Sequence, residues 1–311
     1  MRWDSAQELG STAGLVFFFG VYRLLGRWPF RLISAPVVLW FFIFKPAPRK
    51  AAAEYLGRAL KRPPKLADSI RLFFSFADAA LDKLIAWNGG FSLSDVEFHG
   101  REEIEKVLAG GKGCVLIGSH LGNLEIGRVF SKLRKNPEMH VLMHTRHAEN
   151  FNRMIKKLDP SSQVNLHQVD DLDAGLAAFL SARIESGAIV VMAGDRVPVG
   201  AGQRVSTVPF LGAPAEFPQG PYVLAAALGC PVLLLFCLRR SAGGPKAFDV
   251  YYEPFSDRIA LPRAGREAAL QALAGRFAAR LEHYCAQAPY QWFNMYSYWR
   301  TPPPHDAPTH E

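Results

Sequence analysis

The chain has 311 residues, of which 49% are hydrophobic and 21% are charged, and its net charge is +8. This length allows one or two domains. A mean hydropathy of +0.02 is too low for a protein of several membrane spans and high for an ordinary soluble protein. These values predict a membrane-associated protein that is not embedded in the bilayer.

The basic excess lies at the N-terminus. Residues 1–65 contain eleven Lys and Arg against three Asp and Glu, and the rest of the chain is balanced. Basic residues interleaved with apolar ones suit an anionic membrane surface, where each contributes ~1 kcal/mol. Because no nucleic-acid recognition motif accompanies this charge, we expect no nucleic-acid partner.

Two apolar segments, 11–21 and 32–44, are separated by residues 22–31, which hold three arginines and Pro29. Each is shorter than the ~20 residues of a spanning helix. We predict a pair of helices that enter one leaflet, with a single tilted span over about 30–44 as the alternative. A breaker at 45–49 precedes predicted helices at 54–61 and 69–87.

After residue 90, short apolar runs alternate with amphipathic segments. The predicted strands are 96–98, 114–117, 141–143, 164–169, 189–192, 232–238 and 250–252, and the predicted helices are 124–133, 150–158, 172–186, 218–228 and 263–286. This alternation predicts an α/β fold, a mixed and mostly parallel sheet flanked by helices. We divide the chain into an N-terminal membrane-associated region (1–90), a catalytic region that forms one unit with it (91–300) and a disordered tail (301–311).

The segment 114–125 is predicted to form a strand, a tight loop and the start of a helix, with Asn123 as a plausible N-cap. His120 then lies at the carboxyl end of the strand and Glu125 in the first helical turn. A five-residue step within one helix separates side chains by about 140°, so the two can meet only across the loop-to-helix boundary. A carboxylate that orients a histidine makes it a general base.

Other reactive side chains have simpler interpretations. Ser119 lacks the G-x-S-x-G pattern of a nucleophile. The histidines at 140, 144 and 147 have no matching carboxylate or cysteine pattern, so we expect packed or solvated side chains and no metal site. The four cysteines, at 114, 230, 237 and 285, have no metal-type spacing, and we expect buried, reduced thiols.

The motifs occur in an order that resembles the glycerolipid acyltransferase superfamily. His120 and Glu125 form an HX4E motif, and its Gly-Asn-x-Glu context is similar to the branch of late (lauroyl and myristoyl) acyltransferases of lipid A biosynthesis. The resemblance continues at Arg146 with Asn150, and at the segments 193–196, 208–212 and 291–294. Arg196 and Val197 depart from the branch, which has polar and acidic residues there, so we place the chain in a divergent subgroup.

This resemblance implies a glycerol-phosphate-acyltransferase-like fold and a membrane-associated enzyme that moves a fatty acyl group from a thioester carrier, acyl carrier protein or coenzyme A, to a hydroxyl of a lipid or glycolipid. It implies no cofactor, and it implies a location on the cytoplasmic face of the bacterial inner membrane. The basic segments 132–135 and 153–157 either dock an acidic carrier protein or are solvated faces.

The resemblance also implies roles for single residues. His120 would be the base and Glu125 its orienter, and backbone amides around Gly122 and Asn123 would stabilise the oxyanion. Substrate-binding candidates are Arg146, Asp195 and Arg196, each of which has an ordinary ion pair as its alternative. Trp292, Tyr296 and Trp299 are expected to be core or interfacial anchors, and the lining of an acyl tunnel is their alternative role.

Two other functions remain open from the sequence. A hydrolase would use the same histidine to activate water, and would form product without an acceptor lipid. A non-catalytic membrane protein would need only the N-terminal region, and replacing His120 would then have no effect.

Overall fold

A computed structural model describes residues 12–127, 138–143, 164–169, 173–197, 204–240 and 246–299. The predicted helix at 150–158, the basic segments 132–135 and 153–157, Arg146 and the tail 301–311 lie outside these residues.

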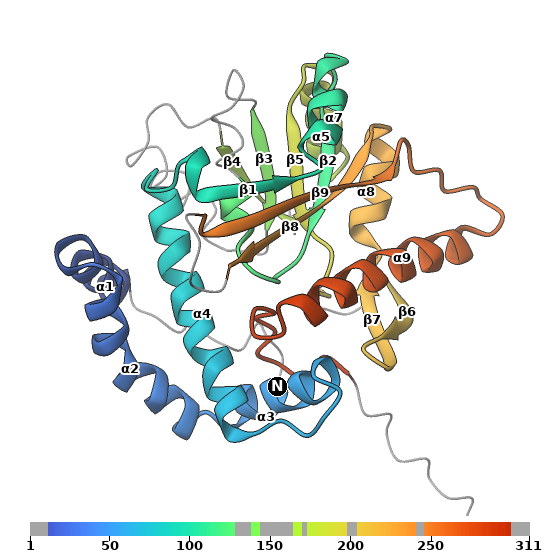
Figure 1. The fold of residues 1–311 in the computed structure, drawn as a ribbon. Helices are drawn as coiled ribbons and strands as arrows, with labels where there is room; N and C mark the ends of the chain where they lie inside the picture. Colours follow the sequence, from blue (N-terminus) through green and yellow to red (C-terminus); the bar gives the residue numbers. More distant parts are fainter. Residues whose placement is uncertain are drawn as a thin grey trace, which may run out of the picture.

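The core is a seven-stranded sheet with the strand order β1-β9-β8-β2-β5-β3-β4 (Figure 1). Neighbouring strands are parallel except β8 and β9, which confirms the predicted mixed and mostly parallel α/β sheet. The strands are β1 (Val96–His99), β2 (Cys114–Gly118), β3 (Met139–Met143), β4 (Val164–Gln168), β5 (Ile189–Ala193), β8 (Val232–Arg239) and β9 (Phe248–Ser256).

Helices cover both faces of this sheet. Val115 and Ile117 of β2 face a cluster formed with α7 (Ala174–Glu185), α8 (Gly220–Leu228) and α9 (Arg266–Gln287). Cys114 and Leu116 face the opposite cluster, which includes α5 (Arg101–Ala109) and the end of α4 (Leu66–Trp87). Because side chains alternate along a strand, a strand with helices on both sides is apolar throughout. That explains the uninterrupted apolar run at 114–117.

A separate hairpin and one helix were not among the predicted elements. Strands β6 (Val205–Phe210) and β7 (Ala213–Pro218) pair antiparallel, and Pro209 lies opposite Pro214. Proline normally argues against a strand because it lacks an N–H donor. A two-stranded ribbon tolerates these prolines, since an outward-facing edge needs no donor. Helix α5 was also missed.

The N-terminal helices α1 (Thr12–Leu25) and α2 (Arg27–Phe44) lie to one side of the sheet, and α4 stands between them and the sheet (Figure 1). The buried residues of α2 fall at four-residue steps, namely Phe30, Ser34, Val38 and Phe42. This spacing forms one helix face, and α2 packs that face against α4. Helix α3 (Pro46–Ala59) follows directly after Lys45.

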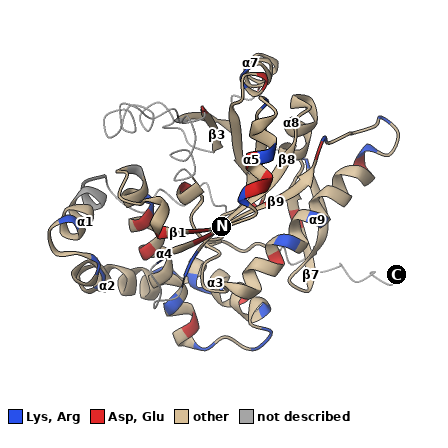
Figure 2. Ribbon diagram, turned by 45° about the horizontal axis from the view of Figure 1, so that its top comes forward, with Lys and Arg blue, Asp and Glu red and all other residues tan. Residues whose placement is uncertain are grey.

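Ion pairs fix α2 to α4. Arg31 forms a bidentate salt bridge with Asp78, in which Nη2 lies 2.8 Å from Oδ2. Arg27 and Arg239 bind the two oxygens of Asp82, a buried carboxylate. Asp82 therefore joins the N-terminal helices to the end of β8. Figure 2 shows basic residues along α2 and the loop after α3, and acidic residues on α4.

Candidate functional site

The ends of two adjacent strands bring His120 and Asp195 together. Strands β2 and β5 are parallel neighbours, with Gly118 opposite Ala193, and each polar residue follows its strand by two positions. His120 Nδ1 lies 2.8 Å from Asp195 Oδ1. The other oxygen, Oδ2, accepts hydrogen bonds from the His120 backbone N–H at 2.8 Å and from Trp292 Nε1 at 2.9 Å.

The surroundings suit a neutral base held by an ionised acid. Asp195 is 1% exposed, and although burial opposes its ionisation, the charges and hydrogen bonds from His120, Trp292 and Arg196 hold its pKa below the usual value. Burial lowers the pKa of His120, and so does the charge of Arg196, while Asp195 acts in the opposite direction. An ionised carboxylate only accepts hydrogen bonds, so Nδ1 carries the proton and Nε2 has a lone pair. The side chain of His120 is 34% exposed, which gives a substrate access to this ring.

The prediction that the carboxylate of Glu125 contacts and orients the ring of His120 is wrong, because the carboxylate at His120 Nδ1 is that of Asp195. Residues 124–127 form a tight helical turn after the loop, and the amide of Glu125, the second residue of this turn, donates to Asn123 Oδ1 at 3.1 Å. The carboxylate of Glu125 lies 3.8 Å from Nζ of Lys83 on α4. Asn123 thus caps the turn as predicted, and a catalytic role for Glu125 stays a prediction.

The backbone amides predicted to form an oxyanion hole are already engaged. Gly122 N–H donates to the carbonyl of Gln291 at 2.8 Å, and Asn123 N–H donates to the carbonyl of Cys237 at 2.9 Å. These bonds hold the loop against β8 and the C-terminal segment. Gly122 has φ +73°, and a Cβ there would lie 1.9 Å from the carbonyl oxygen of Cys237. The loop therefore requires glycine for its shape, and the N–H groups of Gly122 and Asn123 are directed at protein carbonyls.

Arg196 lies where its charge reaches the ring of His120. Its Nη2 donates to the carbonyl of Phe293 at 3.2 Å, and Phe293 N–H in turn donates to the carbonyl of His120 at 3.1 Å. Arg146, the other predicted substrate-binding arginine, lies outside the described residues. Of the three predicted substrate-binding residues, the structure brings Asp195 and Arg196 to the site.

The remaining candidates take structural positions. All four cysteines are buried and unpaired, as expected, and burial raises the pKa of Cys237 and Cys285 and brings that of Cys230 to about 11. Such thiols are poor nucleophiles at neutral pH. Ser119 is buried. His140 is also buried, and its Nδ1 lies 2.9 Å from Nε2 of His167.

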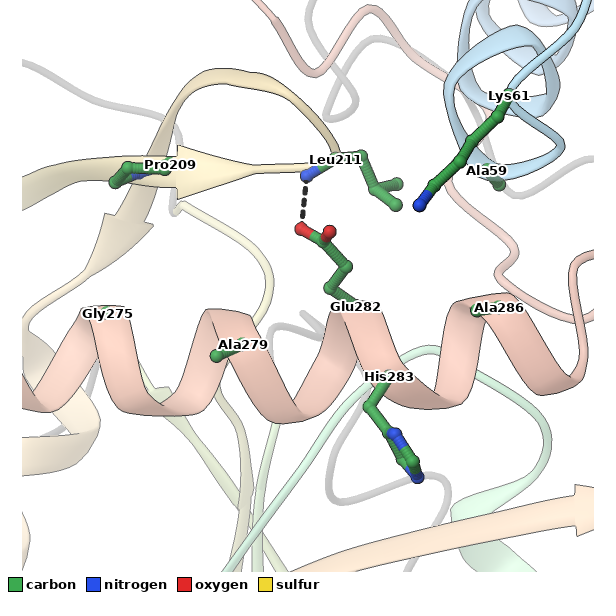
Figure 3. A pocket seen from close by; sticks show the side chains of 9 residues that line it. All are labelled: Ala59, Lys61, Pro209, Leu211, Gly275, Ala279, Glu282, His283 and Ala286. Carbon is green, nitrogen blue, oxygen red and sulfur yellow. Dashed lines mark hydrogen bonds between the residues drawn. The ribbon is translucent and has the colours of Figure 1, made fainter.

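A surface pocket of about 530 Å³ lies between the end of α3, the β6–β7 turn and α9 (Figure 3). Its walls include Leu211, Ala279 and Ala286, with Lys61 and His283 at the sides. Leu211 N–H donates to Glu282 Oε2 at 2.6 Å. Neither His120 nor Asp195 lines it, so this pocket is separate from the His120–Asp195 pair.

Trp292 is the contact that the sequence did not predict. The sequence predicts a core or interfacial anchor, and Trp292 is fully buried, but its indole N–H also donates to the carboxylate of Asp195. The signal available in the sequence was that His120 and Asp195 both follow predicted strands, since parallel strands end at one edge of a sheet.

Fold and site together define an α/β protein with a hydrogen-bonded His120–Asp195 pair at the carboxyl edge of its sheet. The model of the bacterial lipid A biosynthesis acyltransferase family matches residues 79–301, and no curated protein matches the chain. The chain belongs to this family and is an acyltransferase. The match covers α4 from Ala79 onward, the whole sheet and the site.

Proposed function

We propose that this protein is a membrane-associated O-acyltransferase that moves a fatty acyl group from a thioester carrier to a hydroxyl of a lipid A precursor or a related glycolipid. The observation that carries the proposal is the His120–Asp195 pair, in which one ring nitrogen is fixed by a buried carboxylate and the ring is partly exposed.

The reaction follows from the tautomer of His120. Nε2 takes the proton of the acceptor hydroxyl, and the hydroxyl oxygen attacks the carbonyl carbon of the thioester. The tetrahedral intermediate then breaks its carbon–sulfur bond, and the imidazolium returns the proton to the departing thiolate. Asp195 stabilises the imidazolium between these steps. The acyl group passes directly between substrates, because the buried thiols of Cys237 and Cys285 are unsuited to carry it.

Arg196 is our candidate for the positive charge that balances the oxyanion. The amides of Gly122 and Asn123 are already bonded to carbonyls, whereas the charge of Arg196 reaches His120. A preorganised cation at this place stabilises charge that develops on the carbonyl oxygen. Its alternative role is to bind an anionic group of the acceptor.

Helices α1 and α2 supply the membrane contact in this proposal. Their large apolar side chains are unusually exposed, Leu24 at 85% and Trp28 at 71%, and this exposed set also includes Phe17, Leu25, Leu32, Trp40, Ile43 and Phe44. Exposed apolar patches of this kind mark membrane or partner contacts. Arg23 and Lys45, at the ends of the two helices, suit anionic headgroups.

Helix α2 is also long and apolar enough to cross a membrane, judged by its 18 residues and mean hydropathy of 1.3. We favour a position in one leaflet. The buried face of α2 packs against α4 from Phe30 to Phe42, so a spanning α2 would take α4 into the bilayer with it. Helix α4 carries Asp68, Asp78 and Lys83, whose charges are costly there.

The donor is expected to be acyl carrier protein or coenzyme A, and the site is expected to face the cytoplasm, where these carriers occur. The two donors are distinguished by supplying each with the same acyl chain. If the donor is an acidic carrier protein, the KM for the donor should rise with salt concentration, because basic surfaces attract acidic partners and salt screens this attraction.

The test is an acyl-transfer assay with the purified protein in vesicles that contain the glycolipid acceptor. The proposal predicts a product that needs both donor and acceptor, and a loss of ~10²–10⁴-fold in kcat for His120→Ala with an unchanged melting temperature. Release of free fatty acid at the same rate without acceptor would identify a hydrolase. Full transfer by His120→Ala would overturn the mechanism.

A further inference from the structure

We infer that Trp292 is a positioning residue of the reaction. Its indole N–H fixes the orientation of the Asp195 carboxylate, and this orientation keeps the proton of His120 on Nδ1 and leaves Nε2 free to act as the base. This inference rests on the proposed function of His120, and it assigns a role to the C-terminal aromatic segment beyond packing.

The two oxygens of Asp195 have different partners. Oδ2 accepts the indole N–H of Trp292 at 2.9 Å and the backbone N–H of His120 at 2.8 Å, while Oδ1 faces the imidazole at 2.8 Å. An indole nitrogen is a donor only, so its bond to Oδ2 has one possible direction. With Oδ2 held from two sides, rotation of the carboxylate is restricted and Oδ1 stays directed at Nδ1.

The indole itself is held rigidly. Trp292 is 0% exposed, and its ring packs against four others with centroids between 4.9 and 6.2 Å away, those of Tyr55, Phe210, Tyr298 and Trp299. A buried aromatic cluster of this kind leaves the ring little freedom. The donor therefore has a fixed position relative to the sheet.

The backbone joins this segment to the loop that carries the histidine. Leu121 and Trp292 form an isolated antiparallel bridge, flanked by the bonds from Gly122 N–H to the Gln291 carbonyl and from Phe293 N–H to the His120 carbonyl. The backbone of the C-terminal segment is therefore hydrogen-bonded to the loop that carries His120, and the side chain of Trp292 is hydrogen-bonded to the carboxylate that contacts His120. Any movement of Trp292 shifts both the ring of His120 and its partner carboxylate.

A matched control exists in the same cluster. Trp299 is also buried, and its indole N–H donates to the backbone carbonyl of Phe210 at 3.2 Å. Replacement of either tryptophan by phenylalanine removes one hydrogen bond and replaces the two fused rings of the indole by a single ring in the same cluster. Only the change at Trp292 removes a donor from Asp195.

The experiment measures acyl transfer by Trp292→Phe and Trp299→Phe, and by a protein with 3-benzothienylalanine at position 292, which replaces the N–H by sulfur and keeps the shape of the ring. Loss of a hydrogen bond to an ionised group predicts a fall of about 10- to 100-fold in kcat for both changes at 292. We expect KM to stay within about twofold and Trp299→Phe to keep its kcat.

The tautomer of His120, read from 15N chemical shifts of histidine-labelled protein, supplies a readout that packing alone would not move. We expect the Nδ1–H form in the native protein and Trp299→Phe, and a mixture of forms with benzothienylalanine. Wild-type kcat and tautomer with benzothienylalanine would overturn the inference, as would equal losses at positions 292 and 299. A failure of the proposed function is distinguishable, because the unaltered protein would then transfer no acyl group while the tautomer still responds to position 292.

Discussion

Asp195→Asn is the substitution that distinguishes whether Asp195 or Glu125 orients His120. An asparagine can keep both hydrogen bonds at Oδ2, from the His120 backbone N–H and from Trp292, if its amide oxygen occupies that position. Its NH2 group then takes the place of Oδ1, 2.8 Å from Nδ1. An NH2 group is a donor, so Nδ1 must accept and the ring proton moves to Nε2. His120 then cannot take a proton from the acceptor hydroxyl.

The size of this effect follows from the loss of general-base catalysis, which is worth ~10²–10⁴-fold in kcat, or about 3–5 kcal/mol of transition-state stabilisation. The melting temperature should change little, because the asparagine keeps the shape of the side chain, keeps the two hydrogen bonds at Oδ2 and reverses the direction of the third, to Nδ1. We expect a much smaller loss for Glu125→Gln, because the carboxylate that faces the ring of His120 is that of Asp195, whereas the carboxylate of Glu125 lies 3.8 Å from Nζ of the partly exposed Lys83.

Both variants are to be compared with the unaltered protein under saturating donor and acceptor, with the melting temperature measured on the same samples. If Glu125→Gln loses activity by several orders of magnitude and Asp195→Asn keeps it, Glu125 is the orienter as the motif implied. The assignment of Asp195 would then be refuted.

Three other predictions follow from named contacts. Because burial and the charge of Arg196 lower the pKa of His120, kcat/KM should fall with decreasing pH at a midpoint below 6.5, and a midpoint above that value would contradict the site. Asp82→Asn leaves Arg27 and Arg239 without the buried carboxylate they share, which should cost about 3 kcal/mol of stability and about 5 °C in melting temperature; an unchanged melting curve would show that Asp82 does not anchor α2. Leu24→Ser with Trp28→Ser should weaken binding to anionic vesicles at least tenfold in sedimentation assays while the protein stays folded, whereas unchanged binding would exclude α1 and α2 as the membrane contact.

Local patterns were sufficient for most elements of the fold. The apolar runs at 114–117 and 189–192 are strands in the structure, because strands buried on both faces are uniformly apolar. The hairpin β6–β7 was missed because Pro209, Pro214 and Pro218 disguise its alternating pattern. Helix α5 is short, and its nine residues begin after a left-handed glycine with no side-chain cap, so the usual start signal was absent.

The site shows what local patterns do not contain. His120 and Asp195 were both expected at strand ends, yet their contact depends on β2 and β5 being neighbours. The order of strands in a sheet is set by packing between distant segments, and no spacing along the chain encodes it. The HX4E motif points to Glu125 as the orienter, five residues from His120. In the structure, the hydrogen bond from His120 reaches Asp195, 75 residues away, and that from Trp292 to Asp195 spans 97 residues.

The account depends most directly on His120 as the base of an acyl transfer. The decisive measurement is mass spectrometry of lipid extracts from cells that lack this protein and are supplied with either the native chain or His120→Ala. We predict one lipid that gains a fatty acyl increment with the native chain and lacks it with His120→Ala at equal protein level. The same increment in both extracts would contradict the assignment.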